Sequence, residues 1–384
     1  MTILLHCNNM ERPCEFLNER SFVKAPAAMS LIQPLPPGPL DIVGDIHGEL
    51  HALQALLRHL GYDETGRHPQ ARTLVFVGDF VDRGPDSPGV VDLVQRLVEG
   101  GYACAIAGNH EINLLRHDPK DGAGWFFEER VASDTAKYSQ FARATNMLQR
   151  ARIETFLNSL PLGLERHDLR VIHAAWHAPD IAKARQMPLG TARAQYDHWE
   201  AKAAEVAREQ RIAEHMAEEN AIWPHSLEDG ERCPPFLQAH CDNELNKALI
   251  NPLKVLTCGL ERQTPEPFFA GNKWRFVERV AWWNSYTEDT PVVVGHYWRS
   301  TLPAQTTHEG LFRNVGPFAW HGRRGNVFCV DYSVGARAQA RTFNRPHAHM
   351  KLAALRWPER TLVFDDGSTH DTNAFMQSAQ AQPA

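Results

Sequence analysis

Three features are scarce in this chain of 384 residues, and each absence excludes a class of protein. No apolar run reaches the roughly 20 residues that a membrane-spanning helix needs, and the polar N-terminal stretch does not have the pattern of a signal peptide. The seven cysteines are widely scattered, form no CxxC pair and have no framework spacing. We therefore expect a cytoplasmic protein without a membrane partner.

An excess of positive charge is also lacking. The formal net charge is −6, whereas general affinity for nucleic acids depends on Lys and Arg side chains that neutralise phosphates. We therefore predict no nucleic-acid partner, and any phosphate that the protein handles must meet local positive charge. The composition, 43% hydrophobic and 22% charged, is typical of a folded globular protein.

A repeated pattern stands out instead, in which a short apolar run ends in a residue that can bind a metal ion. The runs LDIVGDIH, TLVFVGD, YACAIAGN, LRVIH and PVVVGH end in Asp45 and His47, Asp79, Asn109, His173 and His296. Each run has the length and composition of a buried strand. Because ligands of α/β proteins collect beyond the carboxyl ends of the strands, we expect these six side chains to meet at one edge of a sheet.

The segments between these runs predict an α/β fold with an insertion. The first two are leucine- and valine-rich at helical spacing and end in Gly, so the chain begins β-α-β-α-β. Residues 190–222 have a rough apolar stripe that predicts one long helix. We divide the chain into a loose leader (1–37), a first core part (38–175), an inserted, mainly helical cap (176–290), a second core part (291–366) and a flexible tail (367–384).

The six candidate ligands offer oxygen and nitrogen donors and no thiolate. This mixture suits Mn, Fe or Zn better than Ca or Mg. Asp79 is central enough to bridge two ions, and a pair of cations about 3.5–4 Å apart can lower the pKa of a bridging water and hold a phosphoryl group. The sequence therefore predicts a metal-bound hydroxide as the nucleophile.

A proton donor and a phosphate clamp lie beside the predicted ligands. His110 follows Asn109 directly and can protonate the leaving oxygen, and Asp82 can orient its imidazole. Arg83 offers a planar fork for two phosphate oxygens. Two plainer interpretations stay open: Asp82 caps the turn that follows it, and Arg83 forms a surface ion pair.

Three motifs, GDIHG (44–48), GDFVDRG (78–84) and GNHE (108–111), resemble the signatures of the calcineurin-like metallophosphoesterases. The resemblance is to the phosphoprotein phosphatase branch, with its bacterial serine/threonine phosphatases and symmetrical diadenosine tetraphosphatases. It implies a four-layer αββα sandwich, Asp82 with His110 as the acid pair, and Arg83 as a phosphate ligand. It also implies a first metal held by Asp45, His47 and Asp79, and a second held by Asp79, Asn109, His173 and His296.

The family resemblance further implies a second phosphate-binding arginine between the last two histidine ligands. Arg262, Arg279 and Arg299 are the candidates, and we favour Arg279 because it shortly precedes the last ligand strand. Four tryptophans could stack a nucleobase, although large aromatic side chains are more often core residues. They are Trp282, Trp283, Trp298 and Trp320.

These observations favour a two-metal enzyme that hydrolyses phosphomonoesters, either phosphoproteins or small molecules. The alternative is a dinucleoside polyphosphate hydrolase, which the segments IHAAW and GHYW favour. A scaffold that binds metal or phosphate without catalysis is a third hypothesis, although no ligand and no acid is missing. The sequence does not indicate an oligomeric state.

Overall fold

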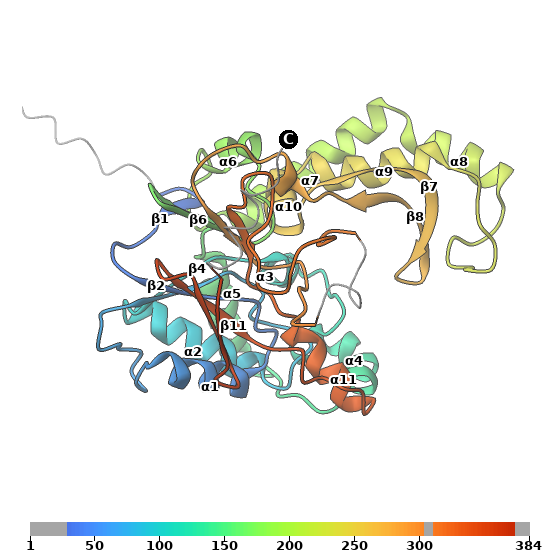
Figure 1. The fold of residues 1–384 in the computed structure, drawn as a ribbon. Helices are drawn as coiled ribbons and strands as arrows, with labels where there is room; N and C mark the ends of the chain where they lie inside the picture. The colour runs from blue at the N-terminus through green and yellow to red at the C-terminus, as the bar shows by residue number, and fades with distance from the viewer. Residues whose placement is uncertain (1–28, 303–309, 373–384) are drawn as a thin grey trace, which may run out of the picture.

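Two β-sheets lie face to face between layers of helices in the computed structural model, which describes residues 29–302 and 310–372 (Figure 1). The first sheet has the order β1 (Ile32–Pro34), β5 (Gly163–Arg166), β6 (Leu169–Ile172), β9 (Val292–Val294), β10 (Val327–Cys329). The second has the order β13 (Thr369–Asp371), β12 (Thr361–Phe364), β11 (Ala353–Trp357), β2 (Leu40–Val43), β3 (Thr73–Phe76), β4 (Ala103–Ala105).

The strands that precede the candidate ligands run parallel within each sheet. In the six-stranded sheet β2, β3 and β4 are parallel, with Val43 beside Phe76 and Phe76 beside Ala105. In the five-stranded sheet β6 and β9 are parallel, with Ile172 beside Val294. Because parallel neighbours end at the same edge, each sheet delivers the residues that follow its strands to one place.

Alternation along the strands explains the layers. Leu74 and Phe76 of β3 pack in the same cluster as the apolar faces of α1 (Leu50–Leu60) and α2 (Ser87–Glu99). Val75 and Val77 point the other way, into the core between the two sheets, where Val171 and Val293 also lie. The outer face of the five-stranded sheet packs with α6 (Ala178–Ala184) and α10 (Pro252–Cys258). The αββα fold class is therefore confirmed.

Four further helices belong to the sandwich part of the chain. They are α3 (Asn109–Leu115), α4 (Val131–Tyr138), α5 (Met147–Asn158) and α11 (Arg337–Thr342). Within the described ranges, no helix combines the length and the apolar character that crossing a bilayer would require.

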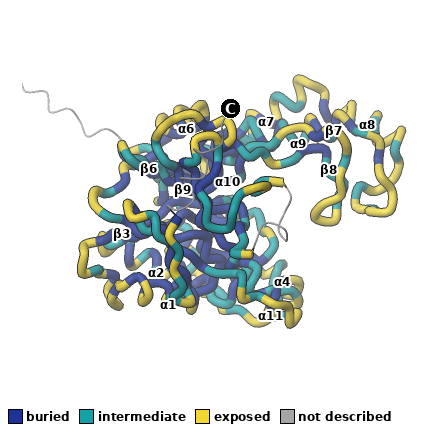
Figure 2. The backbone as a smooth tube through the Cα atoms, viewed as in Figure 1, coloured by how far each residue is buried: buried dark blue, intermediate teal, exposed yellow. Residues whose placement is uncertain are grey.

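Part of the segment predicted as a cap projects from the sandwich as an arm whose surface is largely exposed, whereas α6 and α10 of the same segment pack on the sheet (Figures 1 and 2). The arm contains α7 (Ala192–Glu209), α8 (Ile212–Ile222), α9 (Gln238–Leu249) and a hairpin of β7 (Glu261–Ala270) and β8 (Lys273–Arg279). Phe276 and Cys241 form its small apolar core together with Leu237 and Val277.

The single helix predicted over residues 190–222 is wrong, because the chain turns between α7 and α8. Arg211 adopts a left-handed conformation with φ of 54°. The turn lets α8 pack against α9, where the Glu219 carboxylate accepts the N–H groups of Ala239 and His240 at the first turn of α9. This long-range capping contact leaves no local signal in the sequence.

Parts of the predicted leader and tail are ordered strands. In the predicted leader, β1 pairs with β5, and Leu31 and Leu35 are buried. In the predicted tail, β13 pairs with β12. Both are short edge strands. The partner of β1 is far away in the chain, whereas β13 pairs with the strand just before it. Residues 1–28 and 373–384 lie outside the described residues.

Candidate functional site

The six predicted ligands follow the parallel strands and meet between the two sheets. Asp45 and His47 follow β2, Asp79 follows β3, Asn109 begins α3 after β4, His173 follows β6, and His296 follows β9. Sequence patterns placed all of them at the edge of one sheet, whereas the structure draws them from two sheets that face each other.

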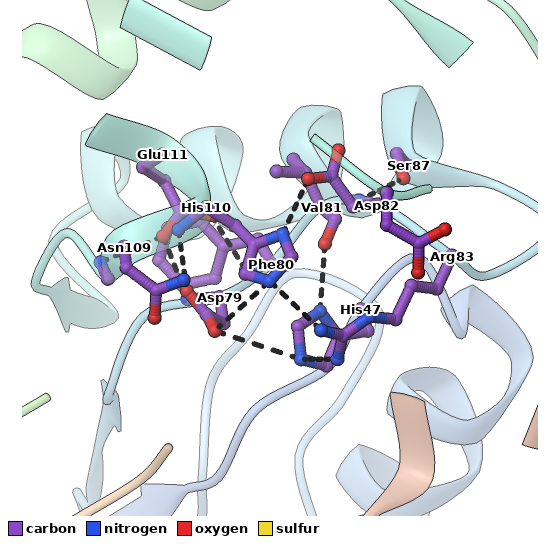
Figure 3. Close-up of polar contacts among 12 residues, drawn as sticks. His47, Asp79, Phe80, Val81, Asp82, Arg83, Ser87, Asn109, His110 and Glu111 are labelled. Carbon is purple, nitrogen blue, oxygen red and sulfur yellow. Dashed lines mark hydrogen bonds and ion pairs between the residues drawn. The ribbon is translucent and has the colours of Figure 1, made fainter. Parts of the chain in front are cut away.

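Asp79 occupies the centre of this arrangement (Figure 3). Its Oδ2 atom lies 3.4 Å from His173 Nε2 and 3.7 Å from His47 Nε2. Two buried groups of potential ligands share this carboxylate, one with His47 and His110 and the other with His173 and His296. Asn109 Oδ1 lies 3.0 Å from His296 Nδ1.

Hydrogen bonds to the backbone orient the imidazole rings. His47 Nδ1 donates to the carbonyl oxygen of Val81 at 3.0 Å, and His173 Nδ1 donates to that of Val77 at 2.7 Å. Each ring therefore turns Nε2 toward Asp79, which is the orientation of a histidine ready to bind a metal ion. The Nε2 atom of His296 is buried and has no hydrogen-bond partner in the described part of the chain.

The buried carboxylate and imidazoles of the cluster shift each other's pKa values. Burial favours a raised pKa for Asp79, but the imidazoles of His173, His110 and His47 outweigh burial and hold that pKa well below its usual range. Burial favours a lowered pKa for His173, yet Asp79 raises it to about 10. A proton on His173 thus supplies the positive charge that the buried carboxylate needs. The same oxygen and nitrogen donors fit a pair of divalent transition-metal ions.

Asp45 lies at the margin of this cluster. Its carboxylate accepts the backbone N–H of His296 at 3.0 Å. Burial, and next the nearby Asp331, raise the pKa of Asp45 well above its usual value. A bound cation would stabilise the ionised form that these neighbours disfavour.

The backbone around the site is strained. Three of the candidate ligands have a left-handed backbone conformation: φ is 46° at His47, 51° at Asp79 and 68° at His296. Asp82 and Arg83 share this conformation, with φ of 74° and 69°. Non-glycine residues adopt it at a cost of about 1–3 kcal/mol each, and such strain is concentrated at functional sites.

Two of the glycines that precede the ligands are required by close approach. A Cβ atom on Gly108 would lie 2.3 Å from Asp79 Oδ1, and one on Gly295 would lie 2.1 Å from Asp45 Oδ1. Any side chain at either position would displace a candidate ligand.

His110 is held by a chain of hydrogen bonds. Its Nδ1 atom lies 2.5 Å from Asp82 Oδ2, and the indole N–H of Trp125 donates to Asp82 Oδ1 at 2.6 Å. Burial favours a lowered pKa for His110, but Asp79 and Asp82 outweigh burial and raise it. Sequence reasoning paired Asp82 with His110 but did not include Trp125, which no motif near the ligands contains.

Arg83 presents its guanidinium to the same space. Its Nη1 and Nη2 atoms lie 3.0 Å from His47 Nε2 and 3.2 Å from His110 Nε2. The ring of Trp298 stacks on it, with the Cζ atom 4.8 Å from the ring centroid. No carboxylate in the described residues lies within salt-bridge distance of Arg83, so its fork can receive an anion.

A cavity of about 510 Å³ opens over these groups. Arg279, the arginine that sequence analysis favoured as a second phosphate ligand, lines this cavity. Arg299 is instead buried and donates to the carbonyl oxygen of Gly316 at 2.7 Å, and Arg262 pairs with Glu278 at 2.7 Å. The full lining consists of Asp79, Arg83, Asn109, His110, Arg279, His296, Tyr297, Trp298, Gly310, Leu311 and Phe312.

The four tryptophans that sequence analysis singled out differ in exposure to this cavity. Trp282, Trp283 and Trp320 are buried core residues, as favoured from their type. Trp298 lines the cavity, where its ring packs on Arg83. Asp331 holds the backbone of Trp298 in place, because its Oδ2 atom accepts the Trp298 N–H at 2.8 Å.

Asp331 was not recognised as a site residue. It follows the apolar run VFCV of β10, which is the same pattern of strand and carboxylate that identified the other candidates. The pattern could therefore have found it.

Glu111 is a second residue whose part emerges only in three dimensions. Its buried carboxylate accepts the backbone N–H groups of Asp79 at 2.8 Å, Phe80 at 2.9 Å and Gly108 at 2.8 Å. Burial and the charge of Asp79 raise the pKa of Glu111 to about 7. It joins the loops after β3 and β4, and so holds Asp79 beside Asn109.

We expect Glu111→Gln to lower the free energy of unfolding by about 1–3 kcal/mol, because an amide NH₂ group would face a buried backbone N–H and leave it without an acceptor. Urea unfolding followed by circular dichroism measures the change. The exposed residue Glu129 provides the control, and Glu129→Gln should change stability by less than about 0.5 kcal/mol. Equal stabilities of the two variants would contradict this role of Glu111.

Comparisons with known proteins agree with this geometry. Residues 38–216 match the family model described as calcineurin-like phosphoesterase. A bis(5'-nucleosyl)-tetraphosphatase PrpE [asymmetrical] of Oceanobacillus iheyensis is 37% identical over 145 residues, which are 37% of this chain and 57% of that relative. The protein of the same name from Anoxybacillus flavithermus is 33% identical over 151 residues, which are 38% of this chain and 61% of that relative. The chain thus spans less than two thirds of the length of these relatives.

Among solved structures, a cold-active protein-tyrosine phosphatase of a psychrophilic Shewanella species is similar with a TM-score of 0.42 and 16% identity. The alignment covers 88% of this chain and 82% of that one. A protein serine/threonine phosphatase from Saccharomyces cerevisiae aligns over 41% of this chain and 47% of its own, with a TM-score of 0.30 and 22% identity. Over residues 38–216, the chain is therefore similar to the calcineurin-like phosphoesterases.

Proposed function

We propose that this protein is a two-metal phosphoesterase that hydrolyses phosphomonoesters. The observation that carries the proposal is the pair of buried ligand groups that share Asp79, next to Arg83, which has no carboxylate partner among the described residues. The first ion would be held by Asp45, His47 and Asp79, and the second by Asp79, Asn109, His173 and His296. Two bound ions of Mn, Fe or Zn would supply a water of lowered pKa and polarise the phosphoryl group.

The other side chains of the cavity have separate parts in this proposal. Arg83 and Arg279 bind phosphate oxygens from two sides of the cavity. His110 gives a proton from Nε2 to the leaving oxygen, while its Nδ1 donates to Asp82. Trp125 holds Asp82 by its second oxygen, so the imidazole cannot turn away from the substrate.

Removal of metal is the direct test. After dialysis against a chelator, we expect hydrolysis of p-nitrophenyl phosphate to fall to background, and Mn, Fe, Zn or Co to restore it. The reason is that no serine, threonine or cysteine lines the cavity as an alternative nucleophile among the described residues. Hydrolysis that persists in the chelator, or that no metal restores, would refute the proposal.

A second candidate function is hydrolysis of a dinucleoside polyphosphate, which the name of the two bacterial relatives favours. Incubation with diadenosine tetraphosphate followed by chromatography distinguishes the products. Two molecules of ADP indicate symmetrical cleavage, and ATP with AMP indicates the asymmetrical cleavage that the relatives' name describes. Unchanged substrate would exclude this candidate.

A further inference from the structure

A second hollow adjoins the candidate active site beneath the cap. Its volume is about 660 Å³, and Arg279, Gly310 and Leu311 line both it and the first cavity. The hairpin of β7 and β8 and the helices α9 and α10 contribute its other walls. We call this second hollow the cap groove. A molecule bound over the metal ligands can therefore extend past Arg279 into the cap groove.

Strand geometry places positive charge along this groove. Arg275, Val277 and Arg279 alternate on β8 and all line the groove, as expected for residues two apart on a strand. Arg275 thus lies roughly 13 Å along the strand from Arg279. Lys254 of α10 and Lys247 of α9 add two more cations from the helices that line the groove.

These four cations have no salt bridge in the part of the chain that is described. Two acidic residues of the groove already have other partners, because Glu278 pairs with Arg262 at 2.7 Å and Glu244 with Lys273 at 3.4 Å. The third, Glu261, is the cross-strand neighbour of Arg279. Burial raises the pKa of Glu261, although the nearby Arg279 and Lys254 act to lower it.

We propose that the cap groove binds a second phosphate group of the substrate, with Lys254 and Arg275 as its ligands. The inference rests on the proposed function, because the phosphate that is cleaved would lie over the metal ligands between Arg83 and Arg279. The favoured substrates are then compounds with consecutive phosphate groups, as in nucleoside polyphosphates, since one chain of phosphates can reach from the first cavity into the groove.

Binding to the full-length protein in the presence of a chelator tests the groove without any hydrolysis. By titration calorimetry we expect Lys254→Gln and Arg275→Gln each to weaken the binding of inorganic tripolyphosphate by about tenfold, the loss of one hydrogen bond to a charged group. Binding of inorganic orthophosphate should change by less than about twofold. The control Arg232→Gln removes an arginine of the cap that does not line the groove and whose partner Asp229 does not line it either, and should change neither.

The same variants are then compared with metal restored. We expect kcat/KM for tripolyphosphate to fall by about tenfold and that for p-nitrophenyl phosphate to stay within about twofold of the unmodified protein. If the variants bound tripolyphosphate as the unmodified protein does, or lost tripolyphosphate and orthophosphate binding equally, the proposal that the groove binds a second phosphate would be wrong. The phosphoesterase proposal would be unaffected. If the variants lost only tripolyphosphate binding and the unmodified protein hydrolysed neither substrate, the groove would bind a second phosphate as proposed, but the proposed catalysis would be refuted.

Discussion

Asp79→Asn is expected to abolish turnover of p-nitrophenyl phosphate and to remove most of the bound metal. Asp79 is the only residue that belongs to both buried ligand groups of the described structure. An amide at this position would lose one negative charge and one of the oxygen donors, so both ions would bind more weakly. The loss should exceed the roughly 10²- to 10⁴-fold effect of removing a general acid. Metal analysis of the purified variant together with its turnover measures both effects.

The control for this experiment is another buried aspartate. Asp134 is 1% exposed, accepts the backbone N–H of Gly124 at 2.8 Å and pairs with Arg130 at 2.7 Å, so its hydrogen bonds are not to any candidate ligand. Asp134→Asn is expected to lower stability but to keep the normal metal content. If Asp79→Asn retained two equivalents of metal, the bridging role of Asp79 would be wrong.

His110→Asn is expected to reduce turnover by about 10²- to 10⁴-fold while the metal content stays near normal, because the variant loses the proton donor but none of the proposed ligands. The structure makes metal analysis essential here. His110 Nε2 lies 3.9 Å from Asp79 Oδ2, and His110 forms one of the two ligand groups together with His47 and Asp79. Loss of one metal equivalent in this variant would identify His110 as a ligand instead of an acid.

Two further variants separate orientation from proton transfer. Asp82→Asn should lower turnover by about 10- to 100-fold, as for partners that orient an essential side chain. His177 supplies the matched control, since its Nδ1 atom lies 2.6 Å from Asp180 Oδ2 in a similar pair outside the cavity. His177→Asn should leave turnover unchanged, and a similar loss there would show that the His110 effect is not specific.

The sequence predicted the strands of the core because their signals are local, whereas the sandwich of two sheets was implied by the family resemblance. Each of the runs before Asp79, His173 and His296 has an apolar strand composition and ends at a polar residue, and β3, β6 and β9 occupy these positions. The sequence indicates that these runs are apolar on both faces, and the structure shows that Phe76 faces the helices and Val75 the other sheet. Strand length, period and turn residues are properties of neighbouring residues, so one sequence is enough to recognise them.

The cap shows where such reasoning fails. The stripe over residues 190–222 continues across Arg211, and only the packing of α8 on α9 makes the chain turn there. β1 and β13 were likewise missed, because each is an edge strand of only three residues, and the partner of β1 is far away in the chain. The division of the chain into core and cap, and its cytoplasmic location, remain predictions.

Alone, the sequence determined which residues could bind metal and phosphate, because residue type and the end of a strand can be recognised from neighbouring residues. Only the tertiary structure decided that these donors come from two facing sheets, that Arg279 and not Arg299 reaches the cavity, and that Trp125, Glu111 and Asp331 hold the site together. The physical reason is that each of these contacts joins residues from separate elements of the fold, and their relative positions follow from packing, which no pattern within one segment encodes.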